Sequence, residues 1–151
     1  MKAMLHCIML AAIAGCGGED VDVNGLAPIA GYQAWGSRTV KGEVPGHGDT
    51  IRVIYANDVA RSYAHAGRYP VGSVLVKEVH EKGDYDQPGK LHETVVMRKV
   101  TEDFLPSSRP LDKGWLFSQL EGGKETRKAL CWDKCHRQGK FDYAWFDYSD
   151  L

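Results

Sequence analysis

The sequence predicts a mainly β domain, in which an antiparallel β-sheet is joined by a few short helices and followed by a C-terminal helix. Three observations support this fold class. Several short segments are rich in β-branched and aromatic residues, turn residues separate them, and the few helix-like segments are short. The chain has 151 residues, which suffices for one domain with a single core.

Strands are expected at residues 50–55, 73–79, 94–100 and 115–120. On the second of these, alternation places Leu75, Lys77 and Val79 on one face, so that Lys77 lies between apolar neighbours. The stretches between the strands predict a turn at 69–72, a polar loop at 81–89 and a connection at 106–110. The order of the segments does not reveal how the strands pair.

Two helices are expected. Asn57 is a suitable N-cap for a short helix over 58–66, which Gly67 ends. A second helix is expected over 124–134, after two glycines. It would carry Cys131 and Cys135 one turn apart on one face.

The N-terminus has the pattern of a secretion signal. Lys2 precedes an apolar run over residues 4–14, which is too short to span a bilayer. The run ends in Ile-Ala-Gly-Cys16, which looks like a bacterial lipobox; an ordinary cleaved signal is the alternative. We therefore expect a lipoprotein signal peptide over 1–15, a lipid anchor at Cys16, a flexible acidic tether over 16–30 and the folded domain over 31–151.

The charge balance argues against nucleic-acid binding. The chain has 19 Lys and Arg against 20 Asp and Glu, with no long basic run. Two of its four cysteines belong to the N-terminal segment, which leaves Cys131 and Cys135 for one site.

The most informative motif is Cys131-Trp-Asp-Lys-Cys135-His136. Two thiols followed at once by a histidine can attach a haem through thioethers while the imidazole ligates the iron. The usual attachment motif has two residues between its cysteines, whereas this one has three. A disulfide between the cysteines is one alternative. A zinc site completed by a distant histidine is another, with His65, His80 or His92 as the fourth ligand.

Taken in order, several segments resemble the cytochrome P-460 family and its relative cytochrome c′-β. The resemblance spans roughly residues 31–146. Its parts are Tyr32-x-x-Trp35, Arg52-Val-Ile-Tyr-Ala-Asn57, Tyr63-Ala64, Tyr69-Pro-x-Gly-Ser-Val-x-Val-Lys77-Glu78, Gly114-Trp-x-Phe117, the Cys-Cys-His motif and Asp142-Tyr-x-x-Phe146.

This resemblance implies a homodimeric β-sheet protein with one covalently attached haem c. His136 matches the proximal iron ligand, and the opposite iron face is open to small nitrogenous ligands. Lys77 matches a lysine that is bonded to a porphyrin meso carbon in one branch of the family. An ammonium between apolar neighbours is costly unless it is neutralised, paired or consumed; the alternative is an outward Lys77 reaching solvent beside Glu78.

The resemblance also implies polar groups around the haem. Arg52 matches a residue that lines the pocket and could bind a haem propionate or ligand, the alternative being a surface arginine. Active family members place a proton-transferring carboxylate just ahead of the first cysteine. That residue is Glu125 here, or else Thr126 or Arg127 occupies the position. Tyr69 and Trp115 either wall the pocket or belong to the core.

The function implied is oxidation of hydroxylamine to nitrous or nitric oxide, with electrons passed to an acceptor such as a small cytochrome. Lys77, Arg52 and Glu125 are the candidate catalytic residues. The alternatives are a nitric oxide-binding protein, an electron carrier with Met97 or a histidine as second axial ligand, and a haem-free lipoprotein. The signal predicts a periplasm-facing protein tethered to a bacterial membrane.

Overall fold

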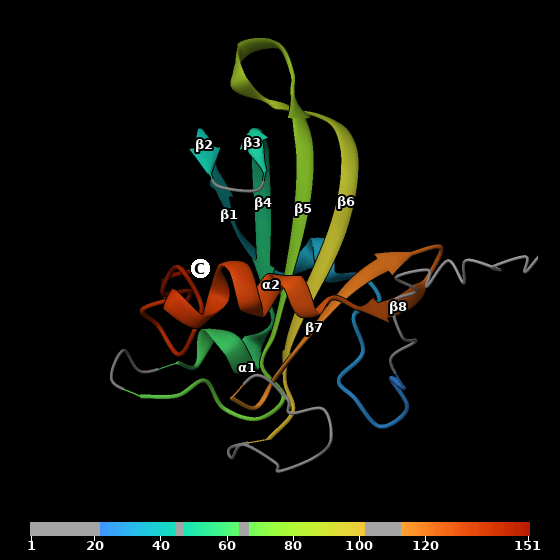
Figure 1. Cartoon of the computed structure of the whole chain (residues 1–151), viewed down its shortest axis with the longest axis vertical. Helices are drawn as coiled ribbons and strands as arrows, with labels where there is room; N and C mark the ends of the chain where they lie inside the picture. Colours follow the sequence, from blue (N-terminus) through green and yellow to red (C-terminus); the bar gives the residue numbers. More distant parts are fainter. Residues whose placement is uncertain (1–21, 45–46, 64–66, 102–112) are drawn as a thin grey trace, which may run out of the picture.

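The fold is built on a six-stranded antiparallel sheet. The structure is a computed structural model that describes residues 22–44, 47–63, 67–101 and 113–151. The strand order is β1-β4-β5-β6-β7-β8 (Figure 1). The strands are β1 (Gly36–Val40), β4 (Ile51–Ala56), β5 (Val74–Lys82), β6 (Pro88–Lys99), β7 (Trp115–Glu121) and β8 (Lys124–Arg127), and a two-stranded piece is formed by β2 (Glu43–Val44) and β3 (Gly48–Asp49).

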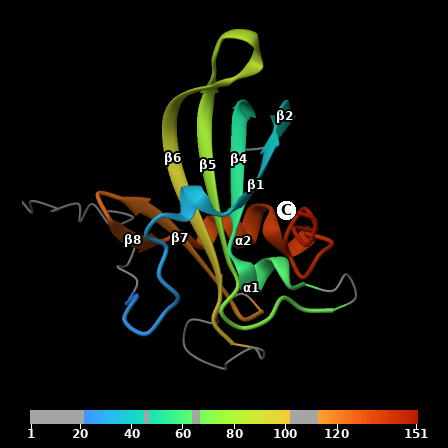
Figure 2. The ribbon, with the colours of Figure 1, turned by 180° about the vertical axis from the view of Figure 1, so that it is seen from behind.

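The helical segments are short and lie around this sheet. They are η1 (Tyr32–Ala34), α1 (Asp58–Arg61), η2 (Asp84–Asp86), α2 (Ala129–Lys134) and η3 (His136–Gln138). In Figures 1 and 2, α2 and the C-terminal segment lie against one face of the sheet, and the N-terminal segment lies against the other. We call these the helix face and the N-terminal face.

Each face of the sheet has its own apolar core. The helix-face core is formed by buried residues of four central strands, of α1 and the connection after it, and of the C-terminal segment. They are Ile54, Ala56, Ala60, Tyr63, Tyr69, Leu75, Met97, Trp115, Phe117, Ala144 and Tyr148. Cys131 packs against this core. The N-terminal-face core is smaller and consists of Tyr32, Val74, Val76 and Val96. Because successive strand residues alternate between faces, the register decides which side chains meet on each side.

The prediction of a mainly β antiparallel fold with a few short helices is confirmed. The four expected strands correspond to β4, β5, β6 and β7, although β5 and β6 are longer than expected. Instead of a polar loop over 81–89, the two strands continue to Lys82 and from Pro88 and are joined by η2. Polar residues are tolerated here because this end of the hairpin is largely exposed.

The prediction of one helix over 124–134 is wrong. Gly122 and Gly123 have φ of 55° and 81°, a conformation that glycine adopts at little cost and that fits a tight hairpin turn. The chain therefore folds back, and β8 pairs with β7. A helix begins only at Ala129 and ends at Lys134, so it includes Cys131 but not Cys135 or His136. The expected C-terminal helix carrying the whole motif is thus not found.

The helix after Asn57 is shorter than expected. The Asn57 side chain accepts a hydrogen bond from Ala60 N, as an N-cap does, and the helix ends at Arg61. Residues 64–66 of the expected helix lie outside the described residues.

The expected signal peptide and lipidation site also lie outside the described residues. Of the expected tether, residues 22–30 are described, and Ala27 and Ile29 pack against the N-terminal-face core. No helix in the described ranges is long and apolar enough to span a membrane.

Candidate functional site

The cysteine–histidine motif lies on the helix face. Cys131 is within α2 and packs against the core, Cys135 directly follows this helix, and His136 begins η3. The backbone N–H of Cys135 donates to Cys131 O. Both cysteines are free thiols and partly exposed. Two thiols and an imidazole are therefore presented within one short segment.

The surroundings of His136 favour the form of its side chain that binds a metal. Its Nδ1 lies 2.9 Å from the carbonyl oxygen of Tyr143, so Nδ1–H donates to it and Nε2 keeps its lone pair. Burial lowers the pKa of His136 to about 4, although this hydrogen bond opposes the shift. The imidazole is therefore neutral at neutral pH, which is the form that binds a metal. The ring packs 4.9 Å from that of Phe117.

The carbonyl that orients His136 belongs to a constrained turn. Asp142 and Tyr143 have φ of 45° and 70°, in the left-handed region. The Asp142 carboxylate accepts hydrogen bonds from Lys99 Nζ at 2.8 Å and from Tyr69 N at 2.9 Å. The Lys99–Asp142 pair is almost fully buried, so it fixes this turn to the sheet.

Gly139 lets the chain close beneath His136, and its replacement is a test of this arrangement. A Cβ here would lie 2.5 Å from Tyr143 C and O and 2.7 Å from Ala144 O. We expect Gly139→Ala to lower stability by about 2 kcal/mol, as overpacking does, and to disturb the ligation of His136. Thermal unfolding and the spectrum of the metal-loaded protein measure both effects.

Gly67→Ala is the matched control, because among the described residues, its chain neighbours apart, no atom lies within 4 Å of its added Cβ. Equal melting temperatures for the two variants would contradict the prediction for Gly139.

Lys77 is brought to the same face as the motif. It lies on β5 between Ile54 of β4 and Val95 of β6. Burial is the main cause that lowers its pKa, and the charges of Cys131 and Cys135 are close enough to act on it. Glu78, the next residue, faces the opposite side and bonds Tyr32. The arrangement with Lys77 reaching solvent beside Glu78 is therefore not found.

Arg52 lies on the helix face with one nitrogen unpaired. It is 3% exposed, and its Nη1 donates to Gly42 O at 2.8 Å and to Thr50 Oγ1 at 3.3 Å. Its buried Nη2 has no hydrogen-bond partner in the described part of the chain. A buried donor without a partner is costly, so this nitrogen suits a carboxylate or another anionic acceptor.

Glu125 lies on the other side of the sheet. It is opposite Leu120, whose side chain packs on the N-terminal-face core. Its carboxylate accepts hydrogen bonds from Arg98 Nη2 at 2.6 Å and from Ser118 Oγ at 2.6 Å. The structure thus does not bring Glu125 to the motif. By register, Thr126 faces the helix side, and Arg127 shares the face of Glu125.

Two residues near Lys77 were missed by the sequence reasoning. His47 Nε2 lies 3.1 Å from Lys77 Nζ, and His47 Nδ1 lies 3.5 Å from Glu93 Oε1. Glu93 is opposite Val79, so it shares the helix face. The sequence could have indicated the position of Glu93, because residues 93 and 95 share a face of a strand, but the strand was expected to begin only at residue 94.

The alternatives to a haem find no support among the described residues. Cys131 and Cys135 are not joined, and within residues 22–44, 47–63, 67–101 and 113–151 no group of three or more His, Cys, Asp or Glu could hold a metal. His80 is bonded to Glu78 and His92 pairs with Glu81, while His65 lies outside the described residues. Met97, Tyr69 and Trp115 are members of the helix-face core.

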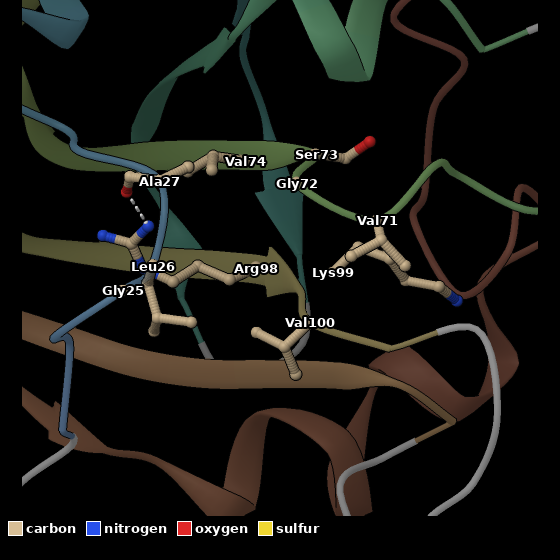
Figure 3. A pocket seen from close by; sticks show the side chains of 10 residues that line it. All are labelled: Gly25, Leu26, Ala27, Val71, Gly72, Ser73, Val74, Arg98, Lys99 and Val100. Atoms are coloured by element: carbon tan, nitrogen blue, oxygen red, sulfur yellow. Dashed lines mark hydrogen bonds between the residues drawn. The ribbon is translucent and has the colours of Figure 1, made fainter.

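The helix face presents the kinds of side chain that hold a covalently attached haem. They supply two free thiols, a neutral imidazole with its Nε2 available, and a buried guanidinium nitrogen that lacks an acceptor. A cavity of about 130 Å³ lies elsewhere, where residues 25–27 cross the ends of β5 and β6 and Arg98 donates to Ala27 O (Figure 3). None of the motif residues lines it, and it is smaller than a typical cofactor pocket.

A comparison with protein-family models found a match that covers most of the chain. The model described as Cytochrome P460 matches residues 29–146, which include the strands of the sheet, α2, η3 and the motif. A search of the curated proteins found no match to the chain.

Proposed function

This chain belongs to the Cytochrome P460 family, a family of haem proteins with redox activity, and from that premise we propose that it oxidises hydroxylamine at one covalently bound haem c. The observation that carries the proposal is the position of Lys77, whose amine lies on the helix face close to Cys131 and Cys135. A haem held there would supply an iron that binds the substrate nitrogen and accepts its electrons.

In this proposal the residues of the helix face would hold the haem. Cys131 and Cys135 would form the thioethers, and His136, whose ring is held by Tyr143 O, would ligate the iron through Nε2. Arg52 would use its Nη2, which has no partner among the described residues, to bind a haem propionate or the substrate. Lys77 would form a bond to the porphyrin and so change its electronic properties.

A haem bound there would supply the redox chemistry: it would pass electrons from hydroxylamine to an acceptor such as a small cytochrome, and nitric or nitrous oxide would be the product. The protein is further proposed to act as a homodimer that is tethered to a bacterial membrane by lipid on Cys16 and faces the periplasm. The support for this location is the lipobox pattern of the sequence.

Lys77→Leu tests the role of the lysine. We expect the variant to retain the haem, to lose the red-shifted ferrous absorption of a crosslinked porphyrin, and to lose most of its hydroxylamine-dependent reduction of an added acceptor. Lys82→Leu is the matched control, because this lysine lies on the same strand but its side chain is 44% exposed. Absorption spectra and steady-state rates per haem measure both effects.

An unchanged ferrous spectrum in Lys77→Leu would overturn the crosslink, and undiminished turnover would overturn its catalytic role. If wild-type protein binds nitric oxide reversibly but shows no hydroxylamine oxidation, the function is ligand binding, as in cytochrome c′-β.

A further inference from the structure

The contact between Lys77 and His47 has no role in the function proposed so far. Lys77 Nζ lies 3.1 Å from His47 Nε2, a distance at which the amine donates a hydrogen bond to the ring. His47 directly precedes β3, and its contact with Lys77 places it over the helix face. The partly buried amine of Lys77 thereby has an acceptor that can also take a proton.

Glu93 favours one tautomer of His47. Its Oε1 lies 3.5 Å from His47 Nδ1, within ion-pair distance, on the side of the ring opposite Lys77. A carboxylate beside Nδ1 favours the tautomer with the proton on Nδ1, which leaves the Nε2 lone pair facing Lys77. The three side chains thus have the arrangement of a nucleophile, a base and a carboxylate that orients the base.

Lys77, His47 and Glu93 connect the interior of the protein to solvent. Lys77 lies deeper in the protein than His47. The side chains of His47 and Glu93 are 26% and 30% exposed. A proton taken from Lys77 therefore has a short path to water through His47.

The charges around this group disfavour a second positive charge. Burial is the main cause that lowers the pKa values of both Lys77 and His47, and Arg52 adds to the lowering in each case. Glu93 opposes it. The titratable groups that act on Lys77 or His47 from neighbouring elements are Arg52 of β4, Glu93 of β6, Cys131 of α2, and Cys135 and His136 after it.

We propose that His47 removes the proton of Lys77, and that Glu93 is a positioning residue that orients His47 for this step, so that the amine becomes a neutral nucleophile for the haem. This inference rests on the lysine–porphyrin bond of the proposed function. An ammonium has no lone pair, so its first proton must leave before Nζ can attack carbon. When the N–C bond forms, one N–H bond of the amine and one C–H bond of the porphyrin are broken, and two protons and two electrons are released. Hydrogen peroxide takes up these protons and electrons and is reduced to two waters.

The test uses the haem-loaded protein and compares wild type with His47→Gln and Glu93→Gln. A glutamine oxygen can accept the hydrogen bond of the amine but cannot take its proton, so the first variant separates placement from proton removal. Matched controls are His92→Gln and Glu81→Gln, since these residues form another His–Glu pair, on β6 and β5, with side chains about half exposed. The readouts are the mass of the Lys77 peptide joined to haem and the rate of crosslinking after peroxide is added.

At pH 7 we expect both relay variants to form the crosslink on the order of 10²-fold more slowly than wild type, the usual contribution of a general base. The rate is expected to recover as the pH rises toward the pKa of Lys77, which burial holds below the ordinary lysine value of about 10.4. Control variants react at the wild-type rate.

Wild-type rates in His47→Gln and Glu93→Gln at every pH would overturn the relay and leave the crosslink standing. A slow rate that does not recover at high pH would overturn it too, because the residues would then act only through structure. If wild type with attached haem never crosslinks, the crosslink itself fails and the relay falls with it. Equal haem content in all variants shows that they fold.

Discussion

Replacing both Cys131 and Cys135 by serine is expected to abolish the covalent retention of haem, which is the largest functional effect of any substitution considered. Serine keeps the size of the side chain but cannot form a thioether. In the proposed function the thioethers would hold the porphyrin near the amine of Lys77, so the double variant would leave this lysine without a positioned ring to bond. Intact mass after extraction with acidified organic solvent measures the effect, since this treatment removes haem that is not covalently bound.

The single variants Cys131→Ser and Cys135→Ser serve as comparisons, because each retains one thioether and is expected to keep part of the haem. If the double variant still retains haem through extraction, Lys77 alone attaches it. Adding Lys77→Leu to the double variant would then remove the remaining haem. That result would show that the lysine–porphyrin bond does not need the thioethers to form first, contrary to the order proposed.

Glu125→Gln is expected to cost about 3 kcal/mol of stability while leaving hydroxylamine oxidation per haem unchanged. Glu125 and Arg98 are 5% and 3% exposed, and two hydrogen bonds of 2.6 and 3.1 Å join them. Removing one charge of a buried pair leaves the other uncompensated, which costs 3–5 kcal/mol in measured cases. Activity is spared because Glu125 lies on the N-terminal face, away from the motif.

Denaturant unfolding measures this stability, with Glu121→Gln as the exposed control on the same hairpin. The pH dependence gives a second readout. Burial raises the pKa of Glu125, but hydrogen bonds from Arg98 and Ser118 outweigh it, so the net shift is downward. A carboxyl with a lowered folded-state pKa contributes stability above its unfolded value of about 4.3, and this is lost as the pH falls below that value.

The glutamine variant should lack this part of the acid sensitivity. A variant that kept its stability but lost turnover would show that Glu125 acts at the haem after all.

Local sequence signals sufficed where the determining interactions are themselves local. Short segments rich in β-branched and aromatic residues predicted β4, β5, β6 and β7, and alternation within the second segment placed Lys77 on one face with Leu75 and Val79. Asn57 was recognised as an N-cap because the hydrogen bond to Ala60 spans only three residues.

The local signal failed at Gly122 and Gly123. Residues 124–127 have acceptable helix propensity, yet the left-handed glycine turn allows them to pair with β7, and this pairing outweighs a weak local preference.

The sequence by itself determined the class of the protein: a β domain with a Cys-Cys-His motif and the order of segments typical of the Cytochrome P460 family. Only the tertiary structure decided which polar residues meet. Strand register moved Glu125 to the face opposite the motif and brought Glu93 and His47 to Lys77. Because side chains alternate between faces, a shift of one residue in pairing exchanges the two sides of a strand, and no local pattern fixes that pairing.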